Sequence, residues 1–172
     1  MSASNPRPRW LAVFLWISVF AWATGFGAKL FELTVLISAW SANPPESLTL
    51  LPYGPRWPFN PGEFFQPLSA FLVIGIVGSL IAGWHTVRSF KLWLWLAVAC
   101  LVAIWAATPT LFWPIIDALY FASTGEKPIE LAEIVALTHR WIVLDWIREG
   151  LIGVGFVASV QAIATQHRAY AA

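Results

Sequence analysis

The chain has 172 residues, of which 59% are hydrophobic and 11% are charged, and its mean hydropathy is +0.70. A soluble domain carries about 25% charged residues, so this composition excludes a water-soluble globular domain and predicts an integral membrane protein. The formal net charge of +1 argues against nucleic acid as a partner, because no basic stripe is available to neutralise phosphates. The single cysteine, Cys100, excludes an internal disulfide and any metal centre built from cysteines of one chain.

The first apolar stretch spans residues 10–40 and carries Lys29 and Glu32. Arg7 and Arg9 precede it as in a signal peptide, but it is much longer than a signal core of about 7–15 residues. We therefore expect an uncleaved membrane helix. Lys29 and Glu32 are i, i+3 neighbours on nearly the same arc as several small residues, which predicts that the pair points into the bundle.

A long connection follows at residues 41–66, with six prolines and five aromatic residues. Proline fixes φ and removes a donor, so regular helix or strand is not expected over most of this stretch. A disordered linker lacks so many aromatic residues. We expect a stiff loop that packs on the helix ends, the alternative being that it lies in the headgroup layer.

The second and third spans are predicted at residues 67–84 and 91–121. Pro109 and Pro114 interrupt the helical hydrogen bonds of the third span, so we expect a kink that exposes carbonyls to a cavity. One stripe of this span, at spacing i, i+4, i+7 and i+11, consists of Ala106, Thr110, Trp113 and Asp117.

The fourth span is predicted at residues 129–165 and contains the segment HRWIVLDWIRE. Its members Trp141, Asp145 and Arg148 recur at i, i+4 and i+7 on one face, which Glu149 borders, whereas His139 points away from it. Charges inside a bilayer are costly and normally face other helices or water. We expect a polar site inside the bundle, the alternative being ion pairs that only lock the helices or lie above the bilayer.

Loop charges predict the orientation of the bundle. The side with both termini carries five basic residues and the other side carries two, so both termini are expected in the cytoplasm. The fold class expected is therefore all-α: an integral membrane four-helix bundle of the bacterial inner membrane, with a long proline- and aromatic-rich loop between helices 1 and 2. The lipid bilayer is its expected partner, and homo-oligomerisation stays open.

The candidate catalytic residues are Lys29, Glu32, His139, Asp145 and Arg148, and the candidate substrate-binding residues are Trp113, Asp117 and Trp141. Asp145 or His139 is the expected proton acceptor, Arg148 or Lys29 the expected stabiliser of an oxyanion, and the two tryptophans stack on an aromatic ring. The sequence has no HExxH or other carboxylate–histidine metal motif, so a metal site is not expected. The sequence assigns no other cofactor, and whether one binds stays open.

Three segments, GFGAKLFE in the first span, FNPGEFF before the second and WIVLDWIR in the fourth, resemble the anthrone-oxygenase-like family of small four-span membrane proteins. The family often has Asn at the polar position of the last segment, where this chain has Asp145. The resemblance implies oxidation of anthrones to anthraquinones without a classical cofactor. It adds Asn60 to the candidate substrate-binding residues, beside Trp141, Asp145 and Arg148, which also match the family motifs.

Three functions remain open from the sequence. The first is an enzyme that acts on a lipophilic aromatic small molecule, with oxygenase-like activity and no cofactor. The second is a non-catalytic accessory protein, or a binder of lipid or quinone, in which the ion pairs hold the loop. The third, a transporter, would require oligomerisation at four spans.

Overall fold

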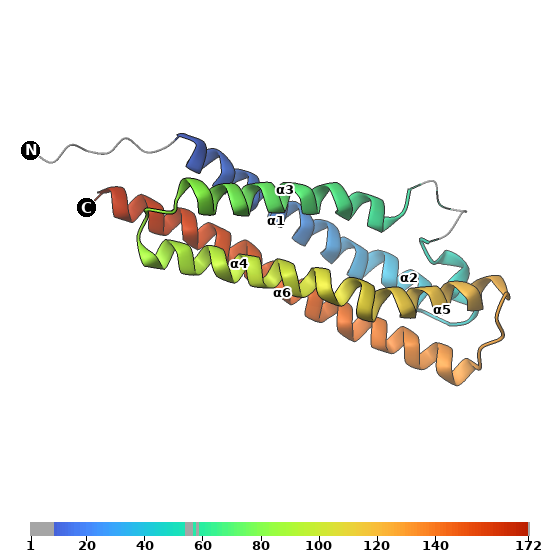
Figure 1. Ribbon diagram of the computed structural model, residues 1–172. Helices are drawn as coiled ribbons and strands as arrows, with labels where there is room; N and C mark the ends of the chain where they lie inside the picture. The colour runs from blue at the N-terminus through green and yellow to red at the C-terminus, as the bar shows by residue number, and fades with distance from the viewer. Residues whose placement is uncertain (1–8, 54–56, 58, 172) are drawn as a thin grey trace, which may run out of the picture.

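The computed structural model describes residues 9–53, 57 and 59–171, with side chains as far as Arg168, and this part of the chain contains helices and no strand (Figure 1). The segments α1–η1–α2 and α4–η3–α5 are each continuous, so each forms one long rod. In chain order the elements are α1 (Arg9–Phe31), the π-helix η1 (Glu32–Ile37), α2 (Ser38–Trp40), the 3₁₀-helix η2 (Glu46–Leu50), α3 (Pro61–Ala82), α4 (Arg88–Ala107), the π-helix η3 (Thr108–Phe112), α5 (Trp113–Thr124) and α6 (Leu131–Ala171).

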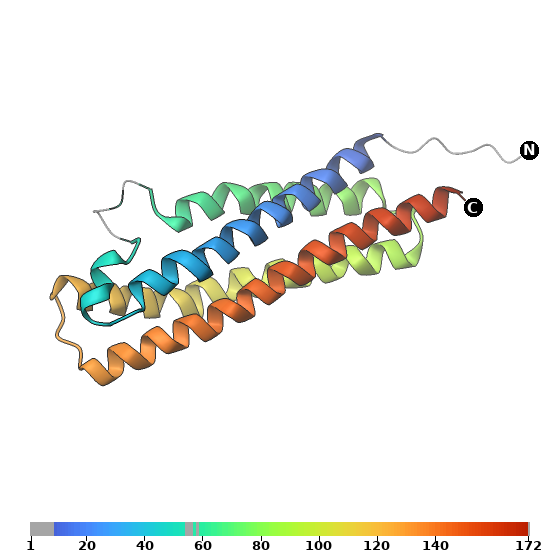
Figure 2. The ribbon, with the colours of Figure 1, turned by 180° about the vertical axis from the view of Figure 1, so that it is seen from behind.

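Four helical stretches are long and apolar enough to cross a membrane: Arg9–Trp40, Pro61–Ala82, Arg88–Thr124 and Leu131–Arg168. The prediction of an all-α integral membrane four-helix bundle is confirmed. The start of α1 and the end of α6 lie together at one end of the bundle (Figures 1 and 2). We call the opposite end, where α2, η2 and α5 lie, the loop end.

The helix α3 begins at Pro61, whereas the sequence analysis starts the second span near residue 67. The Asn60 side chain accepts a hydrogen bond from the Glu63 N–H at 3.2 Å, and the Glu63 carboxylate accepts one from the Asn60 N–H at 3.0 Å. This capping box satisfies two donors at the helix start, and Pro61 in the first turn has no N–H to satisfy. Pro67 therefore lies within the helix and does not begin it.

Small residues bring α1 close to α3 and α6. A Cβ on Gly75 of α3 would lie 2.6 Å from the Ser18 nitrogen of α1, and one on Gly155 of α6 would lie 2.5 Å from the Trp22 ring. The hydroxyls of Ser18 and Ser159 are hydrogen-bonded at 3.0 Å in the same region. Close backbone approach and interhelical hydrogen bonds hold membrane helices together, because lipid supplies no hydrophobic driving force between them.

Buried apolar side chains form two clusters, one along the bundle and one at the loop end. Leu48 of η2 and Leu51 are 1% and 3% exposed, and they belong to the loop-end cluster together with Trp40 and Trp141. This loop segment therefore packs on the helix ends, which favours the first of the two interpretations of the loop. Residues 54–56 and 58 of the loop lie outside the described part of the chain.

Two of the long rods contain a π-helical segment towards the loop end. The segment η3 includes Pro109, whose missing N–H interrupts the α-helical ladder, and the wider π turn accommodates the break. The Thr108 hydroxyl donates to the Ile104 carbonyl at 2.8 Å in the turn before it. The segment η1 contains no proline, and the sequence analysis did not predict it.

Candidate functional site

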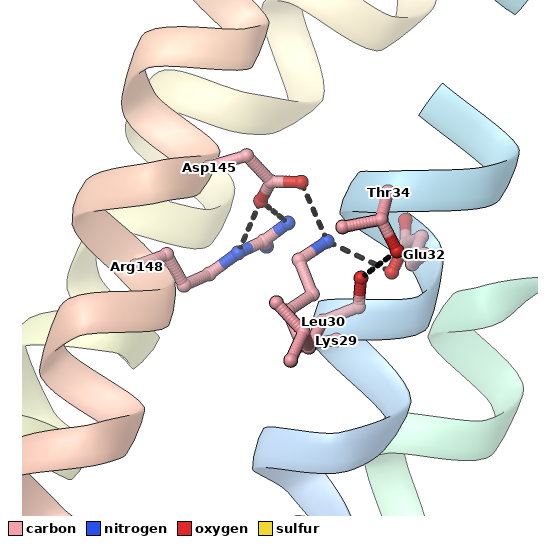
Figure 3. Close-up of polar contacts among 6 residues, drawn as sticks. All are labelled: Lys29, Leu30, Glu32, Thr34, Asp145 and Arg148. Atoms are coloured by element: carbon pink, nitrogen blue, oxygen red, sulfur yellow. Dashed lines mark hydrogen bonds and ion pairs between the residues drawn. The ribbon is translucent and has the colours of Figure 1, made fainter. Parts of the chain in front are cut away.

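A buried ion cluster joins α1 and η1 to α6 (Figure 3). The Lys29 Nζ lies 2.7 Å from Asp145 Oδ2 and 2.8 Å from Glu32 Oε2. All three residues are buried, and Asp145 is 0% exposed. A buried charge is tolerated when a counter-charge and hydrogen bonds replace part of the lost hydration. The i, i+3 spacing of Lys29 and Glu32 places both on one face of the rod, towards Asp145.

Arg148 completes the cluster from the next turn of α6. Its Nε donates to Asp145 Oδ1 at 2.8 Å, and its Nη2 contacts the same oxygen. Its guanidinium carbon lies 3.9 Å from the centroid of the Phe112 ring of η3, a cation–π contact. Because a guanidinium has five N–H donors and two of them meet Asp145, Arg148 keeps donors for another acceptor.

The four residues of the cluster balance in formal charge, with two cations and two carboxylates. A fifth ionisable side chain, Glu149, is also buried, at 4% exposure. Neither of its carboxyl oxygens has a hydrogen-bond partner among the described residues. Glu149 therefore lies beside the network without belonging to it.

Aromatic rings enclose the loop side of the cluster. Trp141 makes edge-to-face contacts with Phe112, Tyr53 and Trp40, at centroid distances of 5.2, 6.2 and 6.4 Å. Tyr53 comes from the long loop. Burial raises the pKa of the Tyr53 phenol well above its ordinary value of 10.0, and the charge of the Glu32 carboxylate and a hydrogen bond with it raise the pKa further. Tyr53 is thus a neutral phenol that donates to Glu32.

A cavity of about 550 Å³ ends on this cluster. Its size falls within the usual range of small-molecule sites, roughly 300–1,000 Å³. Its inner wall contains Lys29, Glu32, Tyr53, Trp141 and Arg148, and its other walls are mostly apolar side chains of α3, α4, η3 and α5. The arrangement resembles a general small-molecule site: an apolar chamber with a few polar groups at one end.

The anthrone oxygenase family profile matches residues 57–158, which is more than half of the chain. The chain belongs to the anthrone oxygenase family. The family match covers α3 to α5 and most of α6, including Trp141, Asp145 and Arg148, while Lys29 and Glu32 on the first rod lie outside it. Comparisons with curated proteins and with solved structures return no significant match.

Several residues that the sequence analysis singled out lie together in this family member. Lys29, Glu32, Trp141 and Arg148 line the inner wall of the cavity, and Trp113 lines it farther out. Asp145 does not line the cavity. It lies behind Lys29 and Arg148 and forms an ion pair with each of them.

Three other candidates lie away from the cavity lining. Asn60 makes the capping box of α3, and His139 and Asp117 are exposed on α6 and α5. Asp117 is exposed because the inward face of α5 carries apolar residues, among them Ile116 and Leu119. Of the three spans that carry candidate charged residues, only the first and the fourth contribute to the cluster.

Tyr53, Phe65 and Phe112 were not among the candidates, although all three line the cavity. Phe65 lies with its centroid 5.8 Å from Lys29 Nζ. The aromatic residues of the loop gave a signal for Tyr53, but their number did not tell which of them faces the cluster. Among residues 9–53, 57 and 59–168, no three His, Cys, Asp or Glu side chains gather as metal ligands do.

Proposed function

We propose that this family member oxidises a lipophilic anthrone-type aromatic ketone to the corresponding quinone with molecular oxygen. The observation that carries the proposal is the mostly apolar cavity of about 550 Å³ that ends on Lys29, Glu32 and Arg148. The apolar walls suit a flat polycyclic ring system, and the buried cations suit a developing oxyanion. The family match supports the same reaction class.

In the proposed mechanism the Glu32 carboxylate takes a proton from the activated CH₂ group of the substrate. The negative charge moves to the carbonyl oxygen, where Arg148 and Lys29 stabilise it. The carbanion transfers electrons to O₂, a carbon–oxygen bond forms, and Glu32 returns its proton to the peroxide. Loss of the second C–H proton and cleavage of the O–O bond release water. In sum, CH₂ and O₂ give C=O and H₂O.

Glu32 suits the role of base better than the two candidates from the sequence analysis. Asp145 pairs with two cations and does not line the cavity, whereas Glu32 pairs with Lys29 alone and lines it. His139 is exposed on α6 outside the cavity lining. We therefore assign Asp145 to positioning Lys29 and Arg148, and Trp141 and Trp113 to contacts with the rings of the substrate.

The variant Glu32→Gln tests this mechanism, because glutamine keeps the size of the side chain but cannot accept the proton. General-base catalysis is worth about 10²–10⁴-fold, so we expect turnover of anthrone by the full chain in lipid nanodiscs to fall by at least about 100-fold. Oxygen consumption and quinone absorbance are measured against protein-free nanodiscs, which report spontaneous oxidation.

The matched control is Glu133→Gln, which changes an exposed glutamate in the first turn of α6. We expect it to retain the parent rate. Full turnover by Glu32→Gln would remove Glu32 from the mechanism, and turnover no faster than in empty nanodiscs for the parent would overturn the proposed activity.

We further propose that the protein lies in the bacterial inner membrane with both termini in the cytoplasm. The start of α1 and the end of α6 lie at the same end of the bundle, which supports a common side for both termini (Figure 1). The described basic residues Arg88, Lys91 and Arg168 belong to the same end, at the start of α4 and near the end of α6. Basic residues are retained on the cytoplasmic side.

A further inference from the structure

Four of the cavity-lining residues are exposed, and they show where the cavity opens. These are Gln66 on α3, Trp105 on α4, Pro109 on η3 and Trp113 on α5. The lining residues from α1 and α6 are all buried or partly buried. The cavity therefore runs from an inner wall on α1 and α6 to a mouth between α3 and the α4–η3–α5 rod. We call these four residues the lateral mouth.

The helix α3 contacts the α4–η3–α5 rod at one end of the bundle and is separated from it at the other. At the end of the bundle opposite the loop end, a Cβ on Gly83 would lie 2.4 Å from the Phe90 ring, so the α3–α4 hairpin is closed there. Nearer the loop end α3 still packs on α1, since a Cβ on Gly25 would lie 3.4 Å from the Leu68 side chain. The cavity is lined there by residues of both α3 and η3.

The length of α3 indicates that the lateral mouth lies near the membrane boundary. The 22 residues of α3 measure about 33 Å at 1.5 Å per residue, close to the hydrocarbon thickness of about 30 Å. The other rods extend beyond the start of α3 at the loop end (Figures 1 and 2). Gln66 lies in the second turn of α3, hence just inside the hydrocarbon edge.

The surroundings of the mouth have the character of a lipid-facing surface. Phe64 and Phe71 on α3 and Val102 on α4 are exposed apolar side chains. The rim itself combines two indole rings, Trp105 and Trp113, with the amide of Gln66. Tryptophan is enriched where hydrocarbon meets the headgroup layer, because its ring has an apolar body and one polar N–H group.

We propose that the lateral mouth admits a flat, uncharged, lipid-dissolved arene directly from the leaflet at the loop end into the cavity. The inference rests on the proposed function for the identity of the arene. The two indoles offer flat surfaces to the rings, and Gln66, Ser69 and Thr108 offer hydrogen bonds to its carbonyl or hydroxyl groups along the way. The arene then reaches Arg148 and Lys29 without crossing the aqueous phase.

The first test measures what surrounds the mouth and needs no ligand. In a Cys100→Ala background, single cysteines are introduced as Gln66→Cys, Ala70→Cys and Glu126→Cys, and each is labelled with the same small fluorophore in nanodiscs. Ala70, exposed on α3 outside the cavity lining, is the lipid reference. Glu126, exposed in the turn between α5 and α6 and outside the four apolar stretches, is the water reference. We expect the Gln66→Cys label to be quenched by chain-linked nitroxide lipids, as at position 70. Quenching mainly by iodide, as at position 126, would overturn the proposal.

The second test measures passage. The variant Gln66→Trp narrows the rim, and Ala70→Trp adds the same ring beside it. A narrower entrance slows entry and exit of a ligand equally and leaves its affinity unchanged. We therefore expect Gln66→Trp to slow both association and dissociation of anthraquinone by about fivefold or more. Its Kd should change by less than about twofold. Ala70→Trp should leave both rates unchanged.

Unaltered rates in Gln66→Trp, or a changed Kd with an unaltered association rate, would contradict a gate at this position. A failure of the proposed function gives a different result. If the parent does not bind anthrone or anthraquinone at all, the assigned substrate is wrong, while the quenching experiment still decides whether the mouth opens to lipid.

Discussion

At the scale of single residues, Asp145 holds the site together because each of its carboxylate oxygens faces a different cation. Oδ2 lies 2.7 Å from Lys29 and Oδ1 lies 2.8 Å from the Arg148 Nε. Lys29 has Glu32 as a second partner, whereas no described carboxylate other than Asp145 forms an ion pair with Arg148. The orientation of both cations towards the cavity therefore depends on one buried aspartate.

The variant Asp145→Ala should destabilise the protein strongly, since it leaves buried positive charge uncompensated. Breaking a buried pair in this way costs about 3–5 kcal/mol. Denaturant unfolding in mild detergent measures the effect, with Asp117→Ala as the control, because Asp117 is exposed and surface changes stay within about 0.5 kcal/mol. Equal stability of the two variants would show that the cluster does not support the fold.

Half of this site follows from local spacing in the sequence. The i, i+3 positions of Lys29 and Glu32, and of Asp145 and Arg148, place each pair on one helix face, and both pairs are in contact. The contact between Lys29 and Asp145 joins segments far apart in the chain, and no local pattern specifies it. Tyr53 and Phe112 reach the cluster through the tertiary fold, which explains why sequence reasoning missed them.

At the scale of elements, the bundle depends on how closely α1 approaches its neighbours. Gly75 lies against the backbone of α1 at Ser18, where no side chain can move aside. Gly150 on α6 is exposed, and a Cβ there would meet nothing within 4 Å. The two glycines therefore differ in packing while both lie within helices.

The variant Gly75→Ala should lower the thermal stability of the detergent-solubilised protein, because the added methyl forces α3 away from α1. Overpacking of this kind costs about 1–3 kcal/mol. The control Gly150→Ala should be neutral or stabilising by up to about 1 kcal/mol, since alanine favours helix over glycine. A thermal unfolding scan compares the two, and a loss of stability in Gly150→Ala alone would contradict this account of the packing.

Hydropathy predicted the existence of the four membrane helices, because a run of about 20 apolar residues matches the length of a membrane-spanning helix. Helix ends and irregular turns were harder. Pro67 suggested a boundary, but the cap at Asn60 and Glu63 starts α3 earlier. Pro109 predicted an irregularity in the third span, which is present as η3, whereas η1 has no marker residue.

At the scale of the whole molecule, the cavity lies where the two apolar clusters meet. Trp22, Leu72 and Ile152 in its walls belong to the cluster along the bundle, while Ile116 and Trp141 belong to the loop-end cluster. The site is thus placed between the part of the bundle with four helices side by side and the end that the loop covers.

The proposed orientation predicts the behaviour of reporter fusions. Green fluorescent protein fused after Ala172 should fluoresce, because it folds in the cytoplasm, and alkaline phosphatase inserted after Ala42 in the loop should be active, because it requires the periplasm. In the control the two reporters are exchanged. Alkaline phosphatase after Ala172 should then be inactive, and green fluorescent protein after Ala42 should not fluoresce. Phosphatase activity at the C-terminus would reverse the orientation and with it the leaflet that feeds the mouth.

The π-helical segment η1 means that the number of residues in the first rod affects its local helix geometry. Its wider turns contain more residues than α-helical turns would, and each residue rotates an α-helix by about 100°. Losing one amino acid between Thr34 and Leu36 would let η1 close into regular α-helical turns, with Ile37 and Trp40 still on the buried side. Relatives with a single deletion here would therefore have an unbroken α-helix in place of η1 and the same surface beneath their loop.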